Sequence, residues 1–266
     1  MKNGLLVVFV LSGFLCASVT AVTDTGQKPS LAKPASVYAS VSADSKVAVA
    51  TVSPYATQIA MDVVARGGNA LDAAIAATFA LGVVDGHNSG IGGGCFILVR
   101  LADGRVLAID GREMAPAAAT RDMFLVDGKA NPELSRTGAL AAGVPGSVLA
   151  LDRLRQLGAV LRWRDLILPS AELADKGFVV SHSLAERLAA TAPYLAKFPA
   201  SAAIYLDDKQ QPWDAGNTLK QADLAATYRA IAKQGAAYFY QGDFARKTER
   251  WMQLNGGLIT RKDFSN

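Results

Sequence analysis

Arg112 is the residue whose type and position best suit chemistry on a bound substrate. It follows an apolar run, residues 106–109, and precedes a turn that contains Pro116. Residues that recognise ligands often lie where a rigid strand opens into a loop. A guanidinium offers two parallel N–H donors to a carboxylate, so a carboxylate is the expected ligand. The alternative is a solvated surface arginine paired with Asp110 or Glu113.

A dense glycine bend precedes this arginine and must position it. Residues 90–94 hold Gly90, Gly92, Gly93 and Gly94, which permit close approach of other backbone segments. A dinucleotide-binding loop is disfavoured, because Cys95 replaces the third glycine and the order of elements is helix, glycines, strand. We therefore expect a tight bend between a buried helix and a buried strand.

Other catalytic chemistries find little support in the chain. His87 and His182 are the only histidines, and neither has a second ligand at metal-binding spacing, so no metal is expected. Ser89 lacks the spacing of the nucleophile elbow of serine hydrolases. Cys95 heads an apolar strand and is expected to be a small buried residue rather than a reactive thiol.

Five motifs carry a resemblance to a known family. In chain order they are Gly67-Gly-Asn-Ala-Leu-Asp-Ala-Ala74, Ser89-Gly-Ile-Gly-Gly-Gly94, Asp110-Gly-Arg-Glu113, Gly143-Val-Pro-Gly146 and Gly256-Gly-Leu-Ile-Thr260. From about Lys46 to the last residue, the chain resembles the large-subunit half of γ-glutamyltransferases, also called γ-glutamyltranspeptidases or glutathione hydrolases.

The resemblance implies an α+β fold, part of the αββα sandwich of N-terminal-nucleophile hydrolases. It further implies a precursor that cuts itself into two subunits and frees a threonine, whose hydroxyl attacks γ-glutamyl amides. The acyl-enzyme then passes the γ-glutamyl group to water or to an amino acid. Arg112 matches the arginine that binds the α-carboxylate of that group, and Glu113 is a possible orienting residue. No cofactor is implied.

The chain departs from the family by ending at Asn266, before the stretch that holds the nucleophile. We expect no catalytic residue in this chain, inactivity when it is alone, and a C-terminal small subunit as partner. Cephalosporin or glutaryl acylases and capsule-polymer transpeptidases share the scaffold and stay open as alternatives. So does a non-catalytic exported protein that binds carboxylates.

The amino terminus predicts export to the periplasm or the exterior. Lys2 precedes an apolar run over residues 5–15, and residues 19–21 suit signal-peptidase cleavage. The expected organisation is a signal peptide at 1–21, a flexible leader at 22–45 and the large-subunit portion at 46–266. An uncleaved membrane anchor is the less favoured alternative, because the run is shorter than the roughly 20 residues that span a bilayer.

Composition excludes one class of partner. The net charge is +4, the pI is about 9.1, and the 27 basic residues are spread along the chain without interleaved aromatic residues. Nucleic-acid binding is therefore not expected. The 51% hydrophobic content is ample for one folded domain.

Periodicity predicts the elements around the motifs. Ser53 and Asn69 should cap helices that start at residues 54 and 70, the second ending near residue 81. A hairpin is expected over residues 96–109, with its turn at Asp103-Gly104. The chain should be mainly helical after residue 114, with helices over residues 162–176, 184–197, 219–234 and 243–255. Pro169 and Pro193 should break or kink the first two of these helices.

Two further expectations concern packing. The aromatic residues 238–240 and Trp251 should belong to the helix-packing core. With few strands in this half, an apolar sheet edge and face should be left uncovered, so residues 46–266 alone should be poorly soluble.

Overall fold

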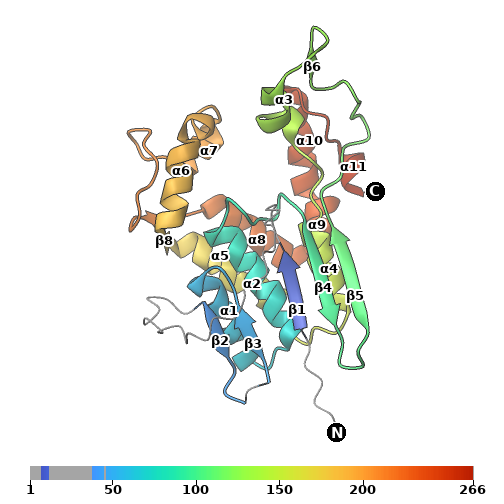
Figure 1. Ribbon diagram of the computed structural model, residues 1–266, viewed down its shortest axis with the longest axis vertical. Helices are drawn as coiled ribbons and strands as arrows, with labels where there is room; N and C mark the ends of the chain where they lie inside the picture. Colours follow the sequence, from blue (N-terminus) through green and yellow to red (C-terminus); the bar gives the residue numbers. More distant parts are fainter. Residues whose placement is uncertain (1–6, 12–37, 45, 266) are drawn as a thin grey trace, which may run out of the picture.

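The computed structural model describes residues 7–11, 38–44 and 46–265. Helices α1 (Pro54–Ala65), α2 (Ala70–Val84), α5 (Trp163–Lys176) and α8 (Ala222–Gln234) pack into a bundle on one side of a small sheet. Helix α4 (Ser147–Gln156) lies against the strands of this sheet, as Figure 1 shows. The fold is α+β and mainly helical after residue 114, as predicted.

The first glycine motif holds the start of α2. The side chain of Asn69 accepts hydrogen bonds from the backbone N–H groups of Leu71 and Asp72. The backbone N–H of Asn69 in turn donates to the Asp72 carboxylate, which completes a capping box. The buried Asp72 carboxylate also accepts from the backbone of Val160 and Leu161. This motif is therefore structural, because it ties α2 to the segment that leads into α5.

The start of α1 differs from the prediction in one detail. Pro54 is the first helical residue, but the side chain of Ser53 makes no capping hydrogen bond. Ser53 is buried, and the hydroxyl of Thr51 donates to its carbonyl oxygen at 2.7 Å. The cap position is thus occupied by the expected residue without the expected bond.

Strands β4 (Cys95–Arg100) and β5 (Val106–Gly111) form the predicted antiparallel hairpin. The two strands pair from Cys95 with Gly111 to Arg100 with Val106. One face of β4 is fully buried, whereas Phe96 and Leu98 on the other face are each 45% exposed. The expectation of an uncovered apolar face is confirmed for these strands.

The expected uncovered sheet edge does not lie at β4; in the described part of the chain, β5 is an outer strand of this sheet. Strand β1 (Val7–Leu11) pairs with β4 along its whole length, which gives the order β1-β4-β5 (Figure 1). Residues 7–11 belong to the predicted signal peptide, whose remaining residues lie outside the described part of the chain. The unpaired backbone N–H and C=O groups along a strand edge favour pairing with any extended segment that can reach them, which explains this pairing.

The folded region begins earlier than the predicted boundary at residue 46. Strand β2 (Ala39–Val41) pairs with β3 (Ala48–Ala50), and β2 contacts α1. The end of the predicted leader is therefore ordered in a hairpin. Residues 22–37 of that leader lie outside the described residues.

The second half supplies the remaining elements. They are β6 (Leu125–Val126), β7 (Lys129–Ala130), α3 (Pro132–Arg136), a 3-10 turn at Ala139–Ala141, β8 (Phe178–Val179), α6 (His182–Leu195), α7 (Pro199–Tyr205), β9 (Thr218–Leu219), α9 (Ala237–Tyr240), α10 (Asp243–Asn255) and α11 (Arg261–Ser265). The four predicted helices correspond to α5, α6, α8 and α10. Helices α6 and α7 stand apart from α3, α10 and α11 at the same end of the molecule (Figure 1).

Proline does not break these helices. Pro169 lies inside α5, which continues to Lys176, and Pro193 lies in the last turn of α6. An internal proline costs about 3 kcal/mol. In α5 this cost is offset by packing, since Leu166, Ile167 and Ala171 are fully buried on either side of the proline.

The aromatic prediction is correct in part. Phe239 and Tyr240 are buried and pack around Phe264 of α11. Trp251 is 43% exposed, so its assignment to the core is wrong. Ala245 and Met252 define the buried stripe of α10, and Trp251 is turned about 100° away from Met252 around the helix.

Candidate functional site: the glycine junction and the neighbouring cavity

Arg112 follows the last residue of β5, where the strand opens into a loop. Its side chain is 47% exposed, and its Nε lies 3.4 Å from Oε2 of Glu113. Its backbone N–H donates to the carboxylate of Asp110 at 2.9 Å. The structure therefore brings the two predicted site residues together and leaves about half of the Arg112 side chain exposed.

The backbone beneath Arg112 is packed too closely for side chains. A Cβ atom on Gly94 would lie 2.6 Å from the carbonyl oxygen of Gly111 and 2.7 Å from the backbone nitrogen of Glu113. Such contacts are shorter than real Cβ atoms make, so only glycine fits. The glycine bend thus places its backbone directly against the segment that carries Arg112 and Glu113.

A third segment closes the same packing arrangement. The backbone N–H groups of Gly146 and Ser147 donate to the carbonyl oxygen of Gly93 at 3.0 and 3.2 Å. Met114 and Val144 exchange two backbone hydrogen bonds, at 3.1 and 2.8 Å. Three motifs that are separate in the sequence therefore meet at one place, which we call the glycine junction (residues 93–94, 111–114 and 143–147).

Sequence reasoning missed the importance of Gly111. A Cβ atom there would lie 2.6 Å from the Cβ of Ala150 on α4 and 3.3 Å from Sγ of Cys95. The small residue at 150 and the glycine at 111 let α4 approach β5. A lone glycine at a strand end gives no indication of the helix that will cross it.

Cys95 lies inside the junction and is not poised for nucleophilic attack. Its side chain is buried, and burial raises the pKa of the thiol to about 11, despite a hydrogen bond from Ser147 that lowers it. A thiol is nucleophilic only as the thiolate. The prediction of an inert buried cysteine agrees with this environment.

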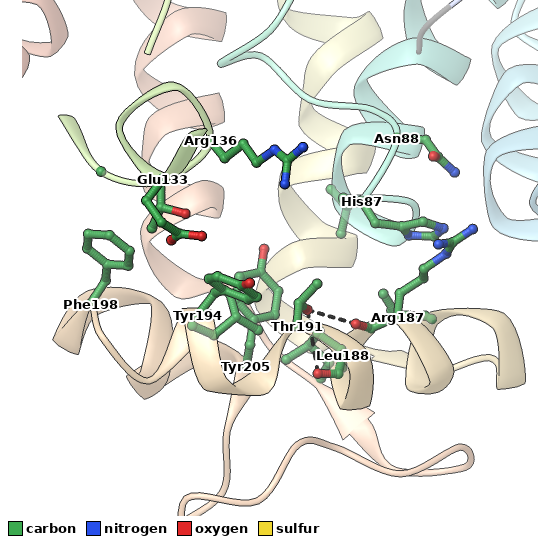
Figure 2. Close-up of a pocket in the computed structure, with 17 residues that line it drawn as sticks. His87, Asn88, Glu133, Arg136, Arg187, Leu188, Thr191, Tyr194, Phe198 and Tyr205 are labelled. Carbon is green, nitrogen blue, oxygen red and sulfur yellow. Dashed lines mark hydrogen bonds between the residues drawn. The ribbon is translucent and has the colours of Figure 1, made fainter. Parts of the chain in front are cut away.

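A cavity of about 790 Å³ lies between the α3 region and helices α6 and α7. Its walls come from the loop after α2, from α3 and the residues after it, and from α6 and α7, as Figure 2 shows. Arg112 and Glu113 do not line it. The predicted site residues and this cavity are thus separate features of the described chain.

The loop wall of the cavity is organised by Asp85. The side chain of Asn88 and the hydroxyl of Ser89 donate to its carboxylate, at 3.2 and 3.3 Å. Nε2 of His87 lies 3.4 Å from the same carboxylate. These contacts fix the first part of the segment that leads from α2 to the glycine junction, and they give His87 a structural partner.

No group of three or more His, Cys, Asp or Glu side chains in the described part of the chain is arranged to hold a metal ion. None of the helices described is both long and apolar enough to cross a membrane.

Comparisons with known proteins connect this geometry to a family. The family model described as gamma-glutamyltranspeptidase matches residues 56–266. The chain is 41% identical over 223 residues to the glutathione hydrolase proenzyme of Escherichia coli strain K12, and 43% identical over 225 residues to that of Bacillus subtilis strain 168. These matches cover 82% of this chain but only 38% and 37% of the relatives.

A solved structure shows the same relationship in three dimensions. The γ-glutamyltranspeptidase of Helicobacter pylori matches with a TM-score of 0.79 and 38% sequence identity. The match covers 81% of this chain and 62% of that one. The predicted fold class and the resemblance of the five motifs are both confirmed.

Proposed function

Because the chain belongs to the γ-glutamyltranspeptidase family, we propose that it is the large-subunit part of an enzyme that cleaves glutathione and other γ-glutamyl amides. The chain spans less than two-fifths of the curated relatives it matches. In this proposal, the rest of the relatives' length corresponds to a small subunit, and this subunit packs against the present chain.

The observation that carries the proposal is the placement of Arg112. Its side chain is 47% exposed at a strand end, and its backbone packs against glycine segments that leave no room for a Cβ atom. A guanidinium held in this way binds a carboxylate with defined direction as well as charge. We assign it the α-carboxylate of the γ-glutamyl group, with Glu113 orienting the guanidinium.

The chemistry in this proposal is divided between two polypeptide segments. A threonine outside these 266 residues attacks the γ-carbonyl carbon through its hydroxyl, while its own α-amino group accepts the proton. The amine leaves, and a γ-glutamyl ester of the threonine forms. Water or the amine of an amino acid then attacks this ester. This chain positions the donor, because none of its own threonines matches the nucleophile motif.

We further propose that the protein works outside the cytoplasm. The support is the sequence pattern at residues 1–21, with a lysine, an apolar run and small residues before the proposed cleavage point. Cleavage there would remove Cys16 and leave Cys95 as the one cysteine of the mature chain.

The test uses the matured two-subunit enzyme and a γ-glutamyl anilide donor. Arg112→Ala leaves a bound carboxylate without its partner, and losing one member of such a pair costs about 2–5 kcal/mol. We expect kcat/KM to fall by about thirtyfold or more. Arg121→Ala is the control, because Arg121 lies in the same loop region with its side chain 95% exposed.

Unchanged kinetics in Arg112→Ala would remove this residue from the substrate site. Comparing glutathione with glutaryl amides in the wild-type enzyme tests the substrate. Preference for glutaryl amides would favour the acylase alternative. Absence of any turnover by the complete protein would favour a non-catalytic carboxylate-binding protein.

A further inference from the structure

Strand β1 covers the edge of β4 with residues that signal-peptide cleavage would remove. Its five residues pair with β4 in an unbroken antiparallel register, from Val7 opposite Arg100 to Leu11 opposite Phe96 (Figure 1). Strand β1 also contacts α2, so it is seated on the folded part of the chain. Residues 7–11 fall within the apolar run of the proposed signal peptide. Cleavage of that peptide would therefore expose the edge of β4.

Strand β4 is built as an inner strand of a sheet. It contains no proline and a single charged residue, Arg100 at its end, so it lacks the features that protect edge strands from pairing. A row of unpaired N–H and C=O groups on such a strand is a template for another extended segment. Once β1 is removed, we expect a segment of the polypeptide beyond residue 266 to take its place.

The same edge leads to the glycine junction. Leu11 lies opposite Phe96, which is two residues after Gly94 of the junction. On the other side of β4, Phe96 is opposite Asp110, two residues before Arg112. Neighbouring strands lie about 4.8 Å apart, so the end of an occupant of this edge is roughly 10 Å from the end of β5. A segment docked there can bring reacting groups close to Arg112.

We propose that residues 7–11 hold the edge of β4 in the precursor before export and delay its self-cleavage until the signal peptide is removed. The proposal rests on the proposed function, since it requires a precursor that matures by hydrolysis of the peptide bond before a threonine. While β1 is paired, a strand of the small-subunit part cannot complete the sheet. Removal of the signal peptide frees the edge, and that strand then replaces β1.

The consequence is a restraint on activity inside the cell. Glutathione sets the redox poise of the cytosolic thiol pool. A glutathione hydrolase that matured before export would consume this pool. Covering the edge with a segment that export removes ties maturation to the compartment in which the enzyme works.

The first test compares two complete precursors purified from the cytosol, one beginning at residue 1 and one at residue 22. Gel electrophoresis over time gives the rate constant at which each is converted into two subunits. The longer precursor should mature about tenfold more slowly, because only the molecules with a free β4 edge can proceed. Equal rates would overturn the proposal.

Two double substitutions in the longer precursor separate strand pairing from apolarity. Alternate residues of an antiparallel strand face the partner, so Val8→Pro with Phe9→Pro removes a ladder donor whichever of the two faces β4. These prolines keep the segment apolar and should restore the rate of the shorter precursor. Val8→Thr with Phe9→Thr lowers apolarity but keeps strand propensity and the backbone donors, so cleavage should stay slow. The reverse pattern would show that the segment acts without pairing, and would overturn the proposal.

A disulfide tests whether the two strands pair in the precursor itself. Phe9 and Leu98 are directly opposite each other. Opposite Cα atoms in antiparallel strands are about 4.5–5.5 Å apart, which suits a disulfide. In a precursor with Cys16→Ser and Cys95→Ala, Phe9→Cys with Leu98→Cys should crosslink on oxidation and stop self-cleavage, and a reductant should restore it. Phe9→Cys with Phe96→Cys is the matched control, because these diagonal neighbours are about 7–8 Å apart and should crosslink poorly.

Two crosslinking results would overturn the proposal: no disulfide in the opposite pair, or equal disulfide formation in both pairs. A failure of the proposed function looks different. If the precursor that begins at residue 22 neither cleaves itself nor hydrolyses a γ-glutamyl anilide, the proposed function fails and this proposal fails with it. If that precursor does both, and the longer one matures at the same rate, only the role of residues 7–11 is contradicted.

Discussion

Arg112 belongs to the glycine junction, where backbone segments pack directly against one another. Arg136 and Arg187 instead line a cavity whose walls are formed by side chains. At the junction a Cβ atom on Gly94 has no room, and three segments exchange main-chain hydrogen bonds. In the cavity the arginines make no ion pair within the described chain, and about 790 Å³ is open. The difference shows where side chains can vary: the junction requires glycine at several positions, whereas the side chains that line the cavity can change without changing the fold.

The largest expected effect comes from breaking the junction. In Gly146→Ala the new Cβ would overlap the carbonyl oxygen of Gly111 and lie 2.8 Å from its carbonyl carbon, and neither backbone atom can rotate away. Overpacking of this kind costs about 3 kcal/mol. The curated relatives are more than twice as long as this chain, so the melting temperature of the matured enzyme should fall by about 2–3 °C.

Gly92→Ala is the matched control for this substitution. Gly92 belongs to the same motif region, but a Cβ atom there meets nothing within 4 Å. Thermal melts of the two variants therefore separate crowding from the general loss of a glycine. A Gly146→Ala enzyme that melts at the same temperature as the Gly92→Ala enzyme would contradict the packing described for the junction.

The next effect concerns the strand that leads out of the junction. Ile97 and Val99 of β4 are fully buried, whereas Phe96 and Leu98 are 45% exposed on the opposite face. In the isolated chain, Phe96→Thr with Leu98→Thr should raise the soluble yield several-fold, because exposed apolar patches favour aggregation. Leu254→Thr, which removes an equally apolar side chain exposed on α10, should have a smaller effect.

The same double substitution should act in the opposite direction in the complete precursor. There the outer face of β4 is the surface on which we expect the second sheet of the sandwich to pack. The yield of matured two-subunit enzyme should therefore fall. A higher yield of both forms would show that this face stays exposed in the complete protein.

The smallest effect tests whether the junction is closed. Burial raises the pKa of Cys95 from 9.0 to about 11, so at pH 8 the thiolate should be about a hundredfold rarer than in the unfolded chain. Labelling of the mature folded protein by a thiol reagent at pH 8 should be slower by at least this factor.

The direction of the accompanying pH effect follows from the same shift. Between pH 9 and 11 the unfolded thiol has lost its proton while the folded one keeps it, so stability falls as the pH rises through this window. Labelling of the folded protein as fast as in denaturant would show that the junction opens readily.

Sequence reasoning found the segments of the junction because each is a short motif that contains glycine, but it did not show that the three segments meet. The cap of α2 was also predictable, because Asn69 and Asp72 lie only three residues apart in the sequence. Trp251 was misplaced because periodicity near the end of α10 does not show which of two neighbouring residues faces inward, and Met252 does. Pro169 was misjudged because packing by distant residues sustains α5 around it.

The cavity could not be predicted in this way. Arg136 and Arg187 are about fifty residues apart, and neither lies in a motif. They line one cavity only because the fold brings α3 and α6 to the same end of the molecule. The pairing of β1 with β4 was likewise missed, since an open strand edge does not specify which segment will cover it.

The most direct test of the central claim is a crystal structure of the matured two-subunit enzyme with L-glutamate bound. We predict that the α-carboxylate of the glutamate lies within hydrogen-bond distance of the Arg112 guanidinium, about 2.7–2.9 Å between nitrogen and oxygen. Its γ-carboxyl group should point toward the threonine of the small subunit. A complex in which Arg112 points into solvent, while the α-carboxylate is bound by other residues, would contradict the account.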